Sequence, residues 1–470
     1  MRLPPLIEHL PSAPELTPEK LWPAFSARPG CAFLDSSLAG ATSATHSILA
    51  CDPWAVLRAT PEGARLLHQD GTEETFPQSA DPLVLLRTLL HQRACPPVPG
   101  LPFLGGAIGW LGYEAGAAWH RVYSKNTDNA PALPSLAFGL YDSAFVYDHV
   151  ARRATLVAAT PADLARLRSV LDDASSGKIP RTANASAPSA VRPTPDLSPA
   201  AYAEALARIR DYIAAGDTYQ VNFTHRFSAP LHDSAAGIYT RLRTLSPAPH
   251  SAYLDFGDHQ IVSSTPERLL RVSGRHLETR PIKGTAARHP DDPAADAASR
   301  ARLLASAKDH AELLMIVDLA RNDLGRVASP GTVRVAARHD LETYSTVHHL
   351  VATVVGELAP GLDRFDALRA LHPGGSITGA PKIRAMQIIA ELEPVPRHAY
   401  TGALGYLGYD GDADLAIAIR TITCAHGHAS YHVGGGITWD SSPIDEYQET
   451  LHKGRSMFSA LTADAPSSTF

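Results

Sequence analysis

Cysteine is scarce in this sequence of 470 residues and never occurs in a close pair. The four cysteines lie far apart and form no C-x-x-C motif: Cys31, Cys51, Cys95 and Cys424. A framework of disulfide bonds is therefore not expected, and a protein of the reducing cytoplasm is the simplest interpretation.

Long apolar segments are missing as well. The least polar stretch, residues 101–119, is interrupted by several glycines and by Glu114, so it is too short to span a bilayer. The first residues, MRLPPLIEHLPSAPEL, lack the apolar core of a signal peptide. We therefore expect a cytoplasmic location and no membrane partner.

Long runs of one charge are also absent. The net charge is -6, and 44% of the residues are hydrophobic and 19% charged, as in an ordinary soluble globular protein. Nucleic acid is therefore not expected as a partner. The glycine-rich stretches match neither G-x-G-x-x-G nor G-x-x-x-x-G-K-[ST], so a nucleotide-binding fold has no support.

One shift in composition divides the chain. Over residues 172–197 serine, alanine, proline and threonine dominate, which predicts a linker or a long surface loop. It separates an N-terminal region, residues 1–171, from a C-terminal region, residues 198–465.

Strand-like and helix-like patterns alternate irregularly, which indicates an α+β fold. β-branched and aromatic runs such as CAFLDSS, AVLRAT, HQIVSS and LAIAIRTITCA predict strands. Helical spacing predicts helices over 199–215 (capped by Ser198), 303–322, 365–371, 380–392 and 444–461. In the second of these we expect four side chains to face a core: Leu313, Leu314, Val317 and Leu319.

Three glutamates lie on two of these helices. Glu312 belongs to the run AELLMIVDLARNDLGRV, and Glu446 and Glu449 are three apart, so they share a helix face. Carboxylates from separate helices suit a hard cation such as magnesium, which prefers oxygen ligands. By spacing alone, three solvated carboxylates are the simpler interpretation.

Glycines and an arginine suggest an anion site. Gly434, Gly435 and Gly436 follow a strand-like run, where bare backbone can aim N–H groups at a carboxylate. Arg420 ends another such run and can pair with a carboxylate. Each pattern alone is equally typical of a tight turn or a surface arginine.

Lys283 lies in RPIKGT and His349 in YSTVHHLVATVV. A lysine with a pKa of roughly 10.4 is a poor nucleophile at neutral pH, but desolvation or a neighbouring cation lowers that pKa. A histidine on an apolar face becomes catalytic only where it reaches a leaving group. Taken singly, an exposed lysine and a core histidine are the simpler interpretations.

The assembled segments carry more weight than any one of them. In order they read SSTPERLL, RPIKGTAARH, AELLMIVDLARNDLGRV, YSTVHHLVATVVGEL, GGSITGAPKIRAMQII, GALGYLGY, AIAIRT, GGGITWDSSPIDEYQET and HKGRSM. This series resembles the chorismate-utilising enzymes: anthranilate synthase component I, aminodeoxychorismate synthase component I, isochorismate synthase and salicylate synthase. It extends over nearly all of residues 198–463. The resemblance implies a large two-part antiparallel β-sheet sandwich flanked by helices.

The resemblance also implies roles for single residues. Glu312 and Glu449 match the family's magnesium ligands, with Glu446 close by. Glu267 matches an acid–base carboxylate, and His349 a histidine near the departing hydroxyl group. Chorismate is a dianion with a poor leaving group, which explains the need for cations and an acid. The matches to chorismate contacts are Gly284, Thr285, Tyr406, Arg420, Gly434, Gly435, Gly436 and Lys453.

Two positions separate the branches of the family. Isochorismate and salicylate synthases carry a lysine base that activates water, and Gln220 stands at the matching place, so a water-adding enzyme is disfavoured. Anthranilate synthases usually read P-I-A-G-T where this chain has Lys283, the mark of the aminodeoxychorismate branch. There the lysine amine attacks carbon 2 of chorismate as the 4-hydroxyl leaves, and ammonia then attacks carbon 4 and expels the lysine.

Partners and regulation follow from the same resemblance. None of the four cysteines lies in a glutaminase-like nucleophile turn, so we expect ammonia from a separate glutamine amidotransferase subunit. Members that bind tryptophan use an N-terminal serine, here Ser36, and a P-Y-M-like segment, here Pro249, His250 and Ser251; whether this chain keeps a tryptophan pocket stays open. Two alternatives also stay open: anthranilate synthase component I, and a non-catalytic homologue that binds chorismate or tryptophan.

Overall fold

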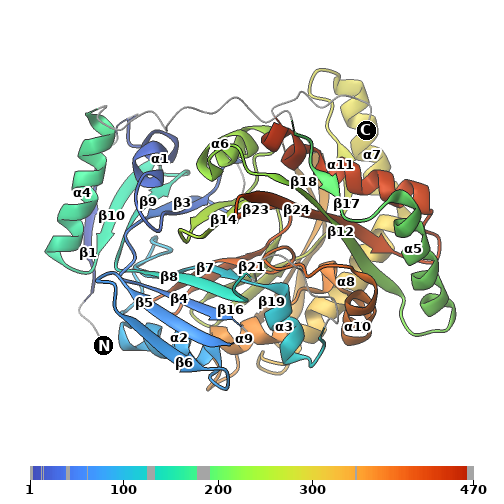
Figure 1. Ribbon diagram of the computed structural model, residues 1–470, viewed down its shortest axis with the longest axis horizontal. Helices are drawn as coiled ribbons and strands as arrows, with labels where there is room; N and C mark the ends of the chain where they lie inside the picture. The colour runs from blue at the N-terminus through green and yellow to red at the C-terminus, as the bar shows by residue number, and fades with distance from the viewer. Residues whose placement is uncertain are drawn as a thin grey trace.

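Two large antiparallel sheets form the body of the protein (Figure 1). The computed structural model describes residues 4–11, 13, 15–38, 43–60, 62–123, 133–176, 191–344 and 347–462. The α+β sandwich expected from the sequence is therefore confirmed. None of the described helices is both long and apolar enough to cross a membrane.

The first sheet contains strands from both predicted regions of the chain. Its middle is formed by β2 pairing with β13, two strands from opposite sides of the predicted linker. In spatial order it runs β1 (Leu6–His9), β10 (Arg153–Ala158), β9 (Ser143–Asp148), β3 (His46–Ala50), β2 (Ala32–Asp35), β13 (His250–Asp255), β14 (His259–Thr265), β23 (Thr421–Ala425), β24 (His428–Ile437), β12 (Gln220–Pro230) and β11 (Thr194–Pro195), with β20 (Gly379–Ala380) beside β12.

The second sheet is also shared between the two regions, because β7 pairs with β21. In spatial order it runs β17 (Ile282–Ala287), β19 (Val347–Glu357), β16 (His276–Arg280), β15 (Arg268–Ser273), β22 (Ala413–Ile417), β21 (Ala403–Gly408), β7 (Gly106–Leu111), β8 (Leu136–Tyr141), β4 (Ala55–Thr60), β5 (Gly63–His68) and β6 (Glu73–Pro77), with β18 (Arg334–Thr343) beside β19.

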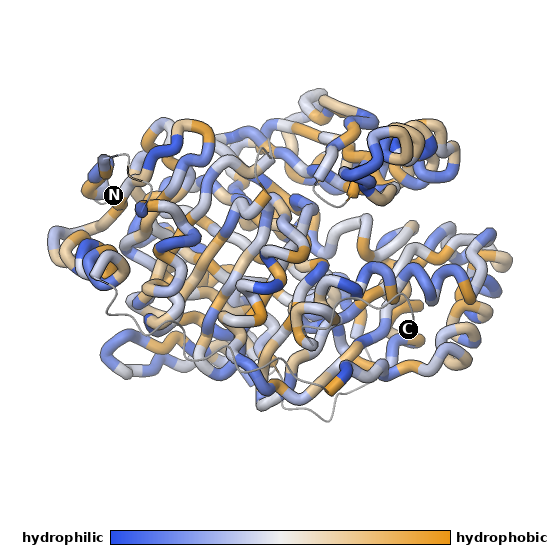
Figure 2. The backbone as a smooth tube through the Cα atoms, turned by 90° about the horizontal axis from the view of Figure 1, so that it is seen from above, coloured by the Kyte–Doolittle hydropathy of each residue, from blue (hydrophilic) through white to orange (hydrophobic). Residues whose placement is uncertain are grey.

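The sheets pack face to face, and helices cover their outer sides. One buried cluster takes side chains from both sheets, including Ile48 and Ile261 from the first and Trp110 and Leu404 from the second. Polar and apolar residues alternate along the outer helices (Figure 2), as expected where one helix face packs on a sheet. The helices are α1 (Pro18–Ser26), α2 (Pro82–Gln92), α3 (Tyr113–Trp119), α4 (Pro161–Ser175), α5 (Pro199–Ala214), α6 (Ala235–Leu245), α7 (Pro293–Ala305), α8 (Ala307–Gly325), α9 (Arg364–Leu371), α10 (Lys382–Leu392) and α11 (Pro443–Thr462), with a short 3-10 turn η1 (Gly375–Ile377).

Most of the predicted helices are confirmed, and two need correction. The hydroxyl of Ser198 caps α5 by accepting the N–H of Ala201, as expected. The helix predicted over 303–322 is two helices, because the chain turns at Ser306, whose side chain caps α8. Leu313 and Val317 are buried as predicted, but Leu314 is 53% exposed. The helix predicted from 380 begins at Lys382, since Gly379–Ala380 pairs with β12.

The run LAIAIRTITCA, expected as strand, is divided between the two sheets. Its first part is β22 in the second sheet, and its last part is β23 in the first. Arg420 lies in the crossing between them with φ of 52°, a strained conformation for a residue with a side chain.

The predicted linker falls largely outside the described residues, since 177–190 are not described. Where the chain is described, α4 extends to Ser175, inside the predicted linker, and β11 lies near its end. The division into regions 1–171 and 198–465 remains a prediction.

Candidate functional site

A cavity of about 880 Å³ gathers most of the predicted site residues. Its walls come from β17 and β19 of the second sheet, from β24 of the first, from helices α8 and α11, and from the turn η1. The predicted residues that line it are Glu267, Lys283, Gly284, Thr285, Glu312, His349, Arg420, Gly434, Gly436, Glu446, Glu449 and Lys453.

The three carboxylates meet in this cavity from two helices. Glu312 comes from α8, and Glu446 and Glu449 from adjacent turns of α11. Burial raises the pKa of Glu446, against a hydrogen bond from the Ser441 hydroxyl at 2.6 Å. Glu446 Oε2 and Glu449 Oε1 lie 3.0 Å and 4.0 Å from where a Cβ on Gly435 would stand, so both face the same stretch of bare backbone.

Lysines neutralise part of this acidic group. Lys453 Nζ lies 2.6 Å from Glu449 Oε1 and donates to the carbonyl oxygen of Gly434 at 3.0 Å. Burial opposes ionisation of Glu449, but Lys453, Lys283 and Lys308 together outweigh it, and the pKa of Glu449 is lowered. Lys308 Nζ lies 3.8 Å from Glu312 Oε1.

The donor chemistry of these glutamates fits a hard divalent cation, because all three offer carboxylate oxygens. Their present arrangement is looser than a formed metal centre. Across the described part of the chain, no three His, Cys, Asp or Glu side chains are grouped closely enough to hold an ion. The Lys453 ammonium supplies positive charge beside Glu449 in this arrangement.

Lys283 is half-buried on β17 and faces the cavity. Among the described residues its ammonium group has no hydrogen-bond or ion-pair partner. Burial lowers the pKa of Lys283, and Lys453 acts in the same direction, although the carboxylates of Glu312, Glu267 and Glu449 oppose them. The Nζ atom lies 3.3 Å from where a Cβ on Gly436 would stand, so the missing side chain leaves the amine its space.

Glu267 is buried, with 4% of its surface exposed, and lies directly before β15. Burial raises the pKa of Glu267 to about 7, against a hydrogen bond from Ser376 and the charge of Lys283. The Ser376 hydroxyl donates to Oε1 at 2.6 Å, and the backbone N–H of Ile282 donates to the same oxygen at 3.4 Å. A carboxyl group with this pKa can donate a proton near neutral pH.

His349 on β19 is a neutral histidine. Burial lowers the pKa of His349 to about 3, and Arg420 acts in the same direction. Its Nδ1 is 2.9 Å from the hydroxyl group of Thr285 on the neighbouring strand β17. The imidazole can therefore form a hydrogen bond to a substrate, but it carries no charge at neutral pH.

Arg420 supplies positive charge on the side of the first sheet. Its side chain lines the cavity, where no described carboxylate forms an ion pair with it. The glycines of β24 also border this part of the site, and the carboxylates of Glu446 and Glu449 face Gly435. An unpaired guanidinium group beside bare backbone suits a carboxylate ligand.

Gln220 lies behind this wall and not on it. Its side chain is fully buried, neither amide atom has a described partner, and Nε2 is 2.2 Å from where a Cβ on Gly436 would stand. Because Gly436 has no side chain, the Gln220 amide and the Lys283 amine both lie close to the same residue of β24.

The structure places Tyr406 elsewhere. It lies in a second cavity of about 90 Å³ and lines it together with all four residues of the predicted tryptophan pocket: Ser36, Pro249, His250 and Ser251. Its position therefore does not support contact with a ligand in the larger cavity, where the tyrosine is Tyr400. The two tyrosines are six residues apart in HAYTGALGYLGY, and their strand-like context did not distinguish them.

Sequence reasoning also missed several polar residues of the larger cavity, among them Asn222, Lys308, Ser376 and Tyr400. Ser376 lies in GGSITGAPK, a segment that contributed to the family resemblance without a role for its serine. Asn222 lies two residues beyond Gln220 on β12, so alternation along the strand was the available signal.

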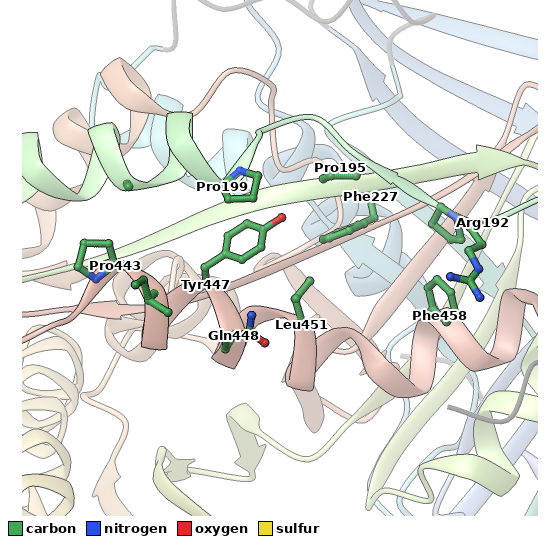
Figure 3. A pocket seen from close by; sticks show the side chains of 12 residues that line it. Arg192, Pro195, Pro199, Phe227, Pro443, Tyr447, Gln448, Leu451 and Phe458 are labelled. Atoms are coloured by element: carbon green, nitrogen blue, oxygen red, sulfur yellow. The ribbon is translucent and has the colours of Figure 1, made fainter. Parts of the chain in front are cut away.

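A third cavity, of about 480 Å³, lies on the other side of α11 (Figure 3). Tyr447, Leu451 and Phe458 point from this helix toward Pro195 and Phe227. None of the predicted site residues lines it, and its wall is mostly apolar, so it offers no acid–base chemistry.

Comparison with known proteins agrees with this geometry. A sequence profile described as chorismate binding enzyme matches residues 45–459. The chain belongs to the chorismate-binding enzyme family. The resemblance seen in the sequence is thereby confirmed.

Relatives within the family carry two different names. The chain is 43% identical over 407 residues to anthranilate synthase component 1 of Streptomyces coelicolor, covering 82% of this chain and 78% of that protein. It is 40% identical over 453 residues to aminodeoxychorismate synthase component 1 of Klebsiella aerogenes, covering 96% and 98%. The names of the relatives therefore do not decide between the two activities, and the choice depends on the residues of the cavity.

A solved structure supports the fold assignment in the family. The crystal structure of anthranilate synthase component I from Streptococcus pneumoniae TIGR4 has a TM-score of 0.76 and 32% sequence identity, with 90% of this chain and 94% of that chain covered. The menaquinone-specific isochorismate synthase of Escherichia coli has the same fold at 18% identity, with a TM-score of 0.71 and 97% and 94% coverage.

Proposed function

We propose that this chain is component I of an aminodeoxychorismate synthase, which converts chorismate and ammonia to 4-amino-4-deoxychorismate on the way to 4-aminobenzoate and folate. The observation that carries the proposal is Lys283: an amine on β17, facing the cavity, with a lowered pKa and no described partner. A lysine in these surroundings has the properties of a nucleophile.

The proposed reaction proceeds in two displacements. The neutral amine of Lys283 attacks carbon 2 of chorismate, the two conjugated ring double bonds shift, and the 4-hydroxyl leaves as water with a proton from Glu267. Ammonia then attacks carbon 4, both double bonds shift back, and the bond to lysine breaks to restore the free amine. The pyruvyl ether is retained throughout.

The other cavity residues hold the substrate in this proposal. Arg420, Lys453 and the backbone N–H groups of the β24 glycines bind the two carboxylates of chorismate, and His349 forms a neutral hydrogen bond near the leaving hydroxyl. Magnesium would be held by Glu312, Glu446 and Glu449, where it would neutralise carboxylate charge on the substrate.

Ammonia comes from a separate glutamine amidotransferase subunit in this proposal. Its support is that the relatives are named as components 1, and that all four cysteines are buried. The purified chain should consume ammonium ions but not glutamine until such a subunit is added. Turnover of glutamine by the chain alone would contradict this part of the proposal.

Anthranilate synthase component I is the second candidate, because the relative from Streptomyces coelicolor carries that name at 43% identity. One experiment separates the two. The purified chain is incubated with chorismate, magnesium and an ammonium salt, and the product is identified by mass and by its conversion to 4-aminobenzoate with added lyase. Anthranilate as the main product would reverse the assignment.

A further inference from the structure

Glu267 offers its two carboxyl oxygens to very different surroundings. Oε1 accepts from the Ser376 hydroxyl at 2.6 Å and from the Ile282 backbone N–H at 3.4 Å. Among the described residues no group donates to Oε2, and the side chain lines the cavity. Oε2 is therefore the oxygen left to meet a substrate.

Both neighbours of Oε1 act as donors toward it. A backbone N–H can only donate, and the Ser376 hydroxyl donates to the same oxygen. Two donors stabilise Oε1 as an unprotonated oxygen, which favours a proton of the carboxyl group on Oε2. Ser376 is 7% exposed and lies in the tight turn η1, so its hydroxyl is held in place by the fold.

We propose that Ser376 is a positioning residue, which keeps the acidic proton of Glu267 on Oε2, toward the leaving hydroxyl group of the substrate. This role rests on the proposed function only in taking Glu267 as the acid. Without the serine, the proton can occupy Oε1, where it faces the protein and not the substrate.

Of the other charged groups near Glu267, one acts on it directly and the rest form ion pairs of their own. Lys283 on β17 is the cation that acts on it directly. Behind η1, Lys382 is paired with Asp323 at 2.5 Å. The guanidinium group of Arg268, next in sequence, is paired with Asp414 and Glu278 at 2.8 Å and 2.7 Å. Ser376 is the only side chain in the described structure that donates a hydrogen bond to the Glu267 carboxyl.

The test is the pH dependence of kcat/KM for chorismate consumption in the full chain with ammonium and magnesium. The wild-type rate falls at high pH as Glu267 loses its proton. In Ser376→Ala the carboxylate loses a donor that stabilises its charge, so this fall moves to higher pH by roughly 1 to 2 units, and the plateau rate drops roughly tenfold. Ser376→Thr keeps a hydroxyl and should retain the wild-type profile.

A control in the same turn separates positioning from general damage. Thr378 is fully buried, and its hydroxyl donates to the carbonyl oxygen of Gly374 at 2.9 Å without touching Glu267. Thr378→Val should leave the pH of the fall unchanged. An unshifted profile in Ser376→Ala, or an equal shift in Thr378→Val, would overturn the proposal.

The assay also distinguishes this inference from the function on which it rests. Chorismate disappearance is measured, so the result holds whichever amino product forms. Glu267→Gln should remove the fall at high pH together with most of the activity. If the fall at high pH persists in Glu267→Gln, Glu267 is not the acid, and the roles proposed for Glu267 and for Ser376 both fail. If the fall is lost in Glu267→Gln but is unshifted in Ser376→Ala, only the role of Ser376 fails.

Discussion

At the scale of single residues, the balance around Lys283 decides what its amine can do. Three carboxylates favour the charged form, yet burial and Lys453 lower the pKa on balance. A structural lysine in a carboxylate-rich cavity would form an ion pair, whereas this amine has no partner in the described structure. Its chemistry is therefore better explained by attack on a substrate than by charge balance.

Substitution of Lys283 tests the covalent role. Lys283→Ala should reduce formation of 4-amino-4-deoxychorismate by roughly 100-fold or more, because the first displacement loses its nucleophile. Lys283→Arg should fail equally, since a guanidinium group stays protonated and cannot attack. Product ratios and trapping of the lysine adduct are the measurements, with the exposed surface variant Lys20→Ala as control. Amination at carbon 4 at the wild-type rate in Lys283→Ala would exclude the covalent role.

The pKa of Glu267 has a consequence for stability as well. Its value is raised from 4.5 to about 7 by burial, so the folded protein holds this proton more tightly than the unfolded chain does. The resulting stabilisation is fully present below the unfolded pKa, and it is lost as the pH rises through about 7. It amounts to on the order of 3 kcal/mol from the size of the shift.

A comparison of wild type with Glu267→Gln measures this pH-dependent contribution to the free energy of unfolding. Glutamine cannot ionise, so wild type should lose stability relative to the variant as the pH rises from 4.5 to about 7, with little further change above that pH. Denaturant unfolding at several pH values in the absence of substrate gives the difference. A constant difference across that range would show that the carboxyl group keeps an ordinary pKa in the folded protein.

At the scale of helices and strands, periodicity predicted the elements well but not their breaks. The run around residues 303–322 has continuous helical spacing, and only the cap at Ser306 reveals two helices. Residues 415–425 alternate like one strand, yet the crossing at Arg420 divides them between two sheets. Local patterns carry no information on such a crossing, because pairing partners distant in sequence determine it.

The site was predictable to the extent that it follows motifs. The lysine, the three carboxylates and most of the glycines taken from the motifs line one cavity, and their roles remain predictions. Tyr406 and Ser376 show what the motifs could not predict. Which of two nearby tyrosines faces a cavity, and which hydroxyl reaches a carboxyl 109 residues away, depends on sheet register and on a turn outside the strand pattern.

The helices α8 and α11 bring the proposed magnesium ligands together, so one residue of α11 tests this arrangement. Glu449→Ala should reduce kcat/KM by roughly 100-fold and abolish its dependence on magnesium, while the melting temperature changes little because the side chain is 54% exposed. The exposed Asp445→Ala on the same helix is the matched control. Full turnover of the wild-type chain in excess chelator would exclude a metal requirement.

At the scale of the whole molecule, the two sheets do not follow the predicted regions. β2 pairs with β13 and β7 pairs with β21, so each sheet is complete only when both parts of the chain are present. The cluster between the sheets takes Trp110 from one part and Ile261 from the other. A fragment would leave long strand edges and apolar faces exposed to water.

Expression of the chain in two pieces tests this. Residues 1–176 and 191–470 produced separately should each aggregate or unfold without a cooperative transition, because neither can complete its sheets. Produced together, they should form a one-to-one complex with the thermal transition and chorismate turnover of the full chain, since the pairing strands lie within the pieces and not at the cut. Size-exclusion chromatography, thermal unfolding and turnover are the measurements. A soluble 191–470 fragment that unfolds cooperatively and consumes chorismate alone would show that the C-terminal region is an independent catalytic domain, and that the shared strands contribute little to holding Lys283 and Glu449 in place.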